Sequence, residues 1–97
     1  MATYVTLYKF TDQGIRNVKD SPKRLEQAIK AGEAKGMKVL GAYYTVGEYD
    51  LVLISETDDE TVGIAHTLSV SALGNVRSTT MKAFTAAEFA AIIKKMS

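Results

Sequence analysis

Segments typical of strands and helices alternate along this chain in an order that few folds accommodate. β-Branched and aromatic residues predict four strands, over 3–10, 37–46, 50–56 and 76–84. Capping residues and apolar residues at helical spacing predict two helices between them, over 21–36 and 58–73. The order is strand, helix, strand, strand, helix, strand. It predicts an α+β fold, the ferredoxin-like antiparallel sheet with two crossover helices on one face.

Capping residues predict where the helices begin and end. Ser21 as N-cap with Pro22 at the first helical position begins the first helix, and Gly36 ends it. Asp58 begins the second helix, with further acidic residues in its first turn, and residues 74–75 end it. Residues 11–20 before the first helix are predicted to form a polar loop. The predicted apolar face of the second helix consists of Val62, Ala65, Leu68 and Ala72.

A further helix is predicted after the fourth strand. Residues 85–88 read Thr-Ala-Ala-Glu, which is the pattern of a capping box. The apolar residues that follow fall at i, i+3, i+4 and i+7, which is one face of a helix. They are Phe89, Ile92, Ile93 and Met96.

Length, composition and charge exclude several classes of protein. The 97 residues predict one domain over 1–97, and 46% of them are apolar, as in globular proteins. Twelve basic and eleven acidic residues leave no basic excess, so we expect no nucleic-acid partner. We also expect no membrane partner, because there is no long apolar run and no signal peptide. The absence of cysteine fits the cytoplasm.

The predicted sheet has apolar residues on both of its faces. In the first strand Tyr4, Tyr8 and Phe10 point to one side, and Val5 and Leu7 point to the other. Two crossover helices cover only one face, and a large apolar patch is unusual on a monomer. We therefore expect a second copy to pack sheet to sheet, in a homodimer or a higher even oligomer. The alternative is that the C-terminal helix covers part of this face.

Three polar segments are expected to meet at one rim of the sheet, because this topology brings the loops there together. They are residues 11–16, residues 47–50 and residues 74–77. One interpretation is a pocket mouth in which an arginine binds a small organic anion. The other is a salt-bridged end cap, with Asp50 serving only as a turn residue. The predicted ligand-binding residues are Arg16, Tyr49, Asp50, Asn75 and Arg77.

Catalytic candidates are few. Tyr49, Asp50 and His66 are the groups that could transfer protons, although tyrosines more often fill interfaces. His66 is the only histidine, and we expect it on the surface of the second helix, beside the apolar face. A metal site is not expected, because His66 has no histidine or cysteine partner. No cofactor is expected either, because no dinucleotide or phosphate-loop motif is present.

The stretch GEYDLV also resembles the signature of a known family. Gly47, Tyr49 and Asp50, with Glu48 inserted, are similar to the Gly-Tyr-Asp motif of GYD domains. The resemblance includes YVTLYKFTDQGIRNVKDSPKR near the start and GNVRSTTMKAF near the end. It implies the fold of the dimeric α+β barrel superfamily, which includes cofactor-independent monooxygenases, dismutase-like haem enzymes and ligand-sensing regulatory domains.

Three functional hypotheses follow from the residues and this resemblance. The first is a homo-oligomeric domain that binds a small molecule at a polar site near the GEYD hairpin. The second is a small cofactor-independent enzyme of the monooxygenase or isomerase type. The third is a regulatory or structural interaction domain. Fold analogy does not choose among them, because one fold serves many functions.

Overall fold

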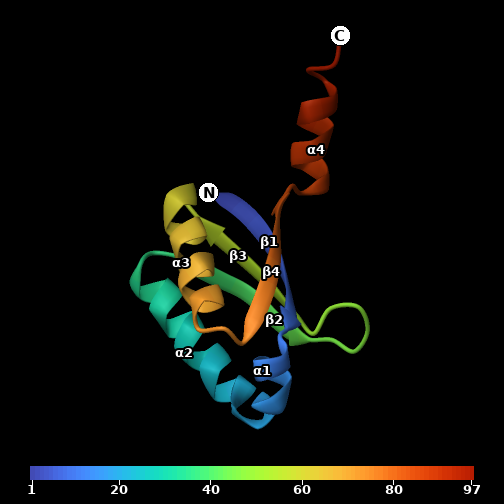
Figure 1. The fold of residues 1–97 in the computed structure, drawn as a ribbon. Coiled ribbons are helices and arrows are strands. Elements are labelled where there is room, and N and C mark those ends of the chain that lie inside the picture. Colours follow the sequence, from blue (N-terminus) through green and yellow to red (C-terminus); the bar gives the residue numbers. More distant parts are fainter.

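The computed structural model describes residues 1–97, and its elements follow the predicted order (Figure 1). Its strands form one antiparallel sheet of order β2-β3-β1-β4, so the predicted ferredoxin-like fold is confirmed. An additional short helix and a 3₁₀ turn, η1, precede α2. The elements are β1 Ala2–Phe10, α1 Asp12–Arg16, η1 Val18–Asp20, α2 Ser21–Ala34, β2 Lys38–Tyr44, β3 Leu51–Thr57, α3 Glu60–Ala72, β4 Val76–Ala83 and α4 Ala86–Ile93.

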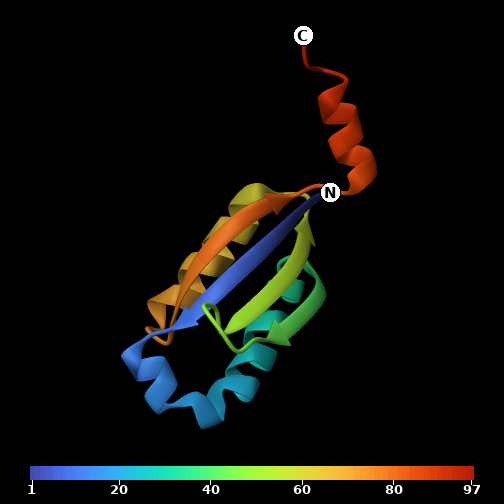
Figure 2. The ribbon, with the colours of Figure 1, turned by 90° about the vertical axis from the view of Figure 1, so that its right-hand side faces the viewer.

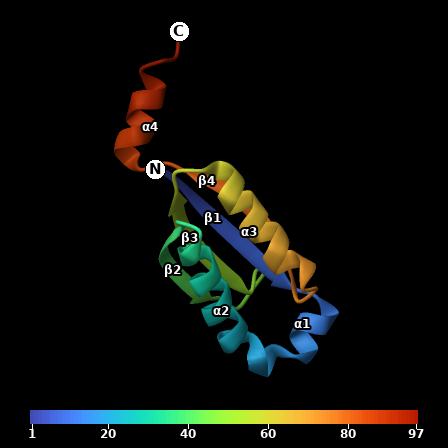
Figure 3. The same cartoon turned by 90° about the vertical axis from the view of Figure 1, so that its left-hand side faces the viewer.

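Helices α2 and α3 lie side by side over one face of the sheet (Figure 3). The core is small and lies beneath them. Tyr8, Leu51 and Leu53 are buried there, and Leu25 and Ile29 of α2 pack against them. Because side chains alternate along a strand, the aromatic side of β1 therefore faces the helices.

The opposite face of the sheet carries no helix, and we call it the open face (Figure 2). Strand register brings its apolar residues together. Val5 is paired with Ile54 on one side and Met81 on the other, and Val52 is paired with Leu7 and Tyr43. Met81 is 46% exposed and Tyr43 is 61% exposed. The open face is thus an apolar surface that its own chain leaves uncovered.

Helix α4 does not cover the open face. It extends beyond the end of the sheet, away from the body of the molecule (Figures 1 and 2), and none of its residues is buried. Its capping box is present as predicted, because the Thr85 N–H donates to the Glu88 carboxylate at 2.7 Å and the Glu88 N–H to the Thr85 hydroxyl at 3.1 Å. The alternative in which this helix covers part of the sheet is wrong. The predicted apolar face of α4 is exposed to solvent as well.

The predicted polar loop at 11–20 is instead helical over most of its length. The Thr11 side chain caps α1 by accepting a hydrogen bond from the Gly14 N–H at 3.1 Å. The same hydroxyl donates to the carbonyl of Gly74 at 2.6 Å, and the Thr11 N–H donates to the carbonyl of Asn75 at 3.1 Å. Because η1 follows α1, Ser21 lies inside the helical run and is not the N-cap of α2. Its hydroxyl lies 2.9 Å from that of Tyr44.

Gly14 stands at the closest approach of α1 to the turn between α3 and β4. A Cβ atom at this position would lie 1.9 Å from the carbonyl oxygen of Asn75, which is far inside van der Waals contact. The obstacle is backbone that is itself hydrogen-bonded to Thr11, so it cannot move without breaking that bond. The joint between α1 and this turn therefore requires glycine.

We predict that Gly14→Ala lowers the free energy of unfolding by about 2 kcal/mol or more, as overpacking at a rigid site does. Gly63→Ala in α3 is the matched control, because a Cβ atom there would meet only the Thr57 methyl at 3.6 Å. The control should be neutral or stabilising by up to ~1 kcal/mol, from helix propensity alone. Urea unfolding measures both values. Equal stability of the two variants would contradict the close approach.

Candidate functional site

The GEYD hairpin joins β2 to β3 and projects toward the open-face side of the sheet (Figure 1). Its ends are held together by the Thr45 N–H, which donates to the Asp50 carbonyl at 2.9 Å, and by the Thr45 hydroxyl, which donates to the Tyr49 carbonyl at 2.5 Å. Val46 at its tip is fully exposed. The hairpin therefore projects from the sheet on the side opposite to α2 and α3.

Asp50 uses its carboxylate to attach this hairpin to β1. The Phe10 N–H donates to the Asp50 carboxylate oxygen Oδ2 at 2.8 Å, and the Asp50 N–H donates to the Tyr8 carbonyl at 2.9 Å. Both bonds extend the pairing of β1 and β3 by one residue. This geometry supports the interpretation of Asp50 as a structural turn residue.

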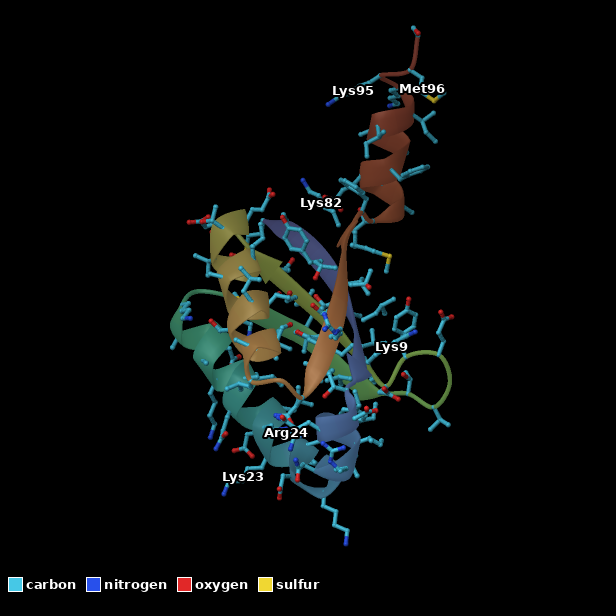
Figure 4. All side chains as sticks on the ribbon, viewed as in Figure 1. Lys9, Lys23, Arg24, Lys82, Lys95 and Met96 are labelled. Carbon is cyan, nitrogen blue, oxygen red and sulfur yellow. The ribbon has the colours of Figure 1, made fainter.

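The other rim residues on the open side form a basic and aromatic group. The Lys9 ammonium lies 5.2 Å from the centre of the Tyr49 ring, within reach of a cation–π interaction, and Figure 4 shows Lys9 on the hairpin side of the sheet. Arg77 is the strand partner of Lys9. Arg16 is exposed and lies in the last turn of α1, where a positive charge interacts favourably with the helix dipole.

The predicted salt-bridged cap is not present. The ion pairs of the structure join the N-terminus to Asp58 and Lys30 to Glu26. Arg16 and Arg77 therefore have no carboxylate partner. The three rim segments do meet, but backbone and amide groups make the bonds between them: the Gln13 amide donates to the Leu73 carbonyl and to the Asn75 side chain, each at 3.1 Å.

A cavity of about 300 Å³ lies on the other side of the sheet, between α2, α3 and the strands. We call it the α2–α3 cavity. Its lining is mainly apolar, and Tyr8, Leu53 and Ile29 contribute to it. The polar and basic residues among its lining are Ser21, Arg24, Gln27, Lys35, His66, Ser69 and Asn75. A mostly apolar pocket with a few convergent polar groups is the usual form of a small-molecule site.

A second cavity, of about 200 Å³, lies under α3 and is rich in hydroxyl groups. The hydroxyls of Thr6 and Thr80 are 3.3 Å apart at its wall, and the Tyr4 hydroxyl is buried there without a hydrogen-bond partner. His66 lines both cavities and stands between them. His66 is therefore placed to contact a ligand in either cavity.

His66 is buried, with 5% of its surface exposed, so the expected surface position is wrong. Burial, and next the positive charge of Lys35, lower the pKa of the imidazole below its usual 6.5. Gly32 makes room for the ring, because a Cβ atom there would lie 3.3 Å from His66 Nε2. The neutral imidazole can thus donate or accept a hydrogen bond at neutral pH.

Helix α3 is rotated relative to the predicted apolar face. His66 is buried and Val62, Thr67 and Val70 are half-buried toward the sheet, whereas Leu68 is 65% exposed. Ala65 and Ala72, which were predicted to face the core, are exposed. Apolar residues occur at helical spacing on both sides of α3, so the pattern alone did not identify the packed side.

The predicted site residues are therefore divided between the two sides of the sheet. Tyr49, Asp50 and Arg77 lie on the hairpin side, Arg16 lies outside on α1, and none of these four lines either cavity. Asn75 and His66 line the α2–α3 cavity. A two-group proton transfer that joins His66 to Tyr49 or Asp50 has no geometric support, because the sheet separates them.

Arg24 is the site residue that sequence reasoning missed. It follows Lys23 in α2, but Lys23 lies on the outer side of the helix whereas Arg24 lies between α2 and α1 (Figure 4). Helical spacing places Arg24 on the flank of the apolar face of α2, one turn before Ala28, and Lys23 on the opposite side of the helix. The hydrogen bond from Arg24 to Asn17 depends on the position of α1, which the sequence predicted as a loop.

The fold offers neither a cluster of metal ligands nor a membrane-spanning helix. No group of three or more histidine, cysteine or acidic side chains has the geometry of a metal site. None of the helices has the length and apolar character needed to span a membrane.

We predict that the stability difference between the wild type and His66→Gln depends on pH. Below about pH 6.5 the unfolded wild type binds a proton at His66 that the native state binds only at lower pH, so its free energy of unfolding falls as pH falls. The variant lacks this proton uptake. The free energy of unfolding of the wild type relative to that of the variant should therefore fall from pH 7 to pH 5, by at most about 1.4 kcal/mol per pH unit. Urea unfolding of both proteins across this range measures it, and parallel curves would contradict the buried neutral imidazole.

Comparison with known proteins yields one family and several related folds. A family model described as the GYD domain matches residues 4–93. A relative from Thermus thermophilus, named glutamine synthetase and cystathionine beta-lyase binding protein, is 27% identical over 95 residues, which cover 97% of this chain and all of the relative.

Solved structures share the fold at lower identity. One from Thermus thermophilus is 24% identical, covers 89% of this chain and 96% of its own, and has a TM-score of 0.54. The structure of MtbAldR has a TM-score of 0.65 at 10% identity over 87% of this chain, which spans about half of MtbAldR. At these identities the likeness concerns the fold alone.

Proposed function

The chain belongs to the GYD domain family, and we propose that it is a self-associating domain that binds a small organic molecule in the α2–α3 cavity. The observation that carries this proposal is the cavity itself. Its volume of about 300 Å³ is at the lower end for small-molecule sites, and its lining is mainly apolar with convergent polar groups. Two residues that the sequence singled out, Asn75 and His66, contribute to that lining.

This proposal moves the expected anion site from the hairpin to the helix side of the sheet. Asp50 and Asn75 already use their side-chain oxygens to hold the backbone and Gln13. Arg16, Tyr49 and Arg77 are exposed or at the edge and line neither cavity. A partly enclosed site favours binding of a small molecule more than these surface groups do.

Self-association is supported by two apolar surfaces that the chain leaves uncovered. One is the open face around Ile54 and Met81, and the other is the apolar side of α4 with Phe89 55% and Ile93 50% exposed. A second copy related by twofold symmetry covers both surfaces with one interface. The hairpin projects on the same side as the open face, where it would meet that copy (Figure 1).

We predict that the protein is an even oligomer in solution and that Ile54→Lys converts it to a monomer. The lysine would place an unpaired charge in the middle of an apolar interface, which costs several kcal/mol. Ala34→Lys, at an exposed position of α2, is the control with the same added charge. Native mass spectrometry gives the stoichiometry. A monomeric wild type, or an Ile54→Lys variant that stays oligomeric, would contradict the sheet-to-sheet interface.

We predict that an uncharged apolar probe, 4-phenylbutyramide, binds in the α2–α3 cavity. Backbone amide resonances near Ala28 and Val70, which line the cavity, should shift on titration, and those of Val5 on the open face should not. Ala28→Phe, which fills the cavity, should abolish the shifts, whereas Ala34→Phe on the outside of the same helix should keep them. Absence of binding, or shifts confined to the open face, would contradict the proposal.

A second candidate function is binding of metabolic enzymes. The relative from Thermus thermophilus is named for binding glutamine synthetase and cystathionine beta-lyase. In this chain Ile64 and Leu68, one turn apart on α3 at the edge of the second cavity, are 53% and 65% exposed, which suits a protein partner. A native mass spectrum of the chain mixed with glutamine synthetase from its own host tests this candidate, and the absence of a joint complex would count against it.

A further inference from the structure

The α2–α3 cavity is positively charged. Arg24 and Lys35 are its charged lining residues, and no aspartate or glutamate reaches it. The other polar groups at its wall are uncharged amides, hydroxyls and the imidazole of His66. Charges in a partly enclosed site are screened less than those on a surface. The cavity is therefore complementary to an anion.

Arg24 has hydrogen-bonding capacity that the protein does not use. Its Nη1 donates to the carbonyl of Asn17 at 2.9 Å, and this bond fixes the direction of the guanidinium. Its Nη2 is buried and has no hydrogen-bond partner. Neither ion pair of the structure includes Arg24. A buried donor without a partner is costly, so such a group in a pocket points to an acceptor that arrives from outside.

The cavity continues from Arg24 along the whole of α2. Arg24 lies in the first turns of this helix, and Gly32, which contacts His66, lies in its last turn. Eight residues of α-helix rise about 12 Å. The part of the cavity between these two ends is lined by Leu25 and Ile29 on α2 and by Leu53 on the sheet. The site thus has Arg24 at one end, an apolar middle, and the imidazole of His66 together with Lys35 at the far end.

We propose that the α2–α3 cavity binds an ionised carboxylic acid with an apolar body, with the carboxylate held by Arg24. The carboxylate accepts a hydrogen bond from Nη2 of Arg24, and the body lies between Leu25, Ile29 and the sheet with its far end toward His66. A guanidinium matches a carboxylate in plane and charge. This inference rests on the proposed ligand-binding function and names the chemical class of the ligand.

The test compares acids with their uncharged amides. The probes are phenylacetic, 3-phenylpropionic and 4-phenylbutyric acids, each beside its primary amide, titrated by calorimetry at pH 7.5. At least one acid should bind about tenfold or more tightly than its amide, because charge-assisted hydrogen bonds to arginine are strong. Arg24→Met should remove this preference and leave the amide affinity unchanged.

Lys23→Met is the matched control. It removes a neighbouring positive charge on the outer side of α2 (Figure 4) and should keep the preference for the acid. Equal affinities of acids and amides for the wild type would overturn the carboxylate inference and leave the proposed function standing. Absence of binding by every probe would overturn both. A preference that survives Arg24→Met would overturn the role of Arg24.

A second measurement on the wild type guards against a variant that fails to fold. The arginines of the chain are Arg16, Arg24 and Arg77, so their side-chain Nε–H resonances are few enough to resolve. Addition of the best acid should shift the Arg24 resonance, assigned with Arg24→Lys, and the matching amide should not. A shift at Arg16 or Arg77 instead would overturn the inference and favour the rim.

Discussion

The close approach of Gly14 to the carbonyl of Asn75 is the constraint on which the cavity depends. It lets α1 lie directly against the turn that begins β4, where Thr11 donates two hydrogen bonds. Helix α1 in turn sets the position of Asn17, whose carbonyl accepts the bond that aims Arg24. A residue with no side chain thus influences, through two steps, where Arg24, one of the two cations of the cavity, lies.

The sheet separates the cavities from the hairpin side, where the sequence placed the ligand site. Its helix side contains the two cavities, with His66 between them. Its open side carries an apolar surface and the GEYD hairpin, whose aspartate is committed to the Phe10 N–H. Under the proposed function, one side binds a small molecule and the other binds a second copy. The GEYD motif then shapes the hairpin on the side that binds the second copy. Residues of α2 and α3 bind the ligand.

Sequence patterns predicted correctly those features that depend on residues close together in the chain. The Thr85–Glu88 capping box and the order of the strands are confirmed, because they depend on neighbours within four residues and on side-chain alternation. The prediction was wrong at α1, at the packed side of α3 and at two helix starts, because the N-caps of α2 and α3 are Asp20 and Asp59 and not Ser21 and Asp58. The hydrogen bonds that join α1 to the rest of the fold lead to the turn at Gly74, about sixty residues away. His66 is buried because Gly32, on another helix, leaves room for it.

The sequence by itself determined the family, the α+β order, the capping box of α4 and the presence of apolar residues on both faces of the sheet. These follow from periodicity and from short-range hydrogen bonding. The tertiary structure alone decided which arginine faces the cavity, which side of α3 packs and that α4 stands away from the sheet. Each of these depends on how far apart two elements lie, and that distance is set by side chains remote in the sequence.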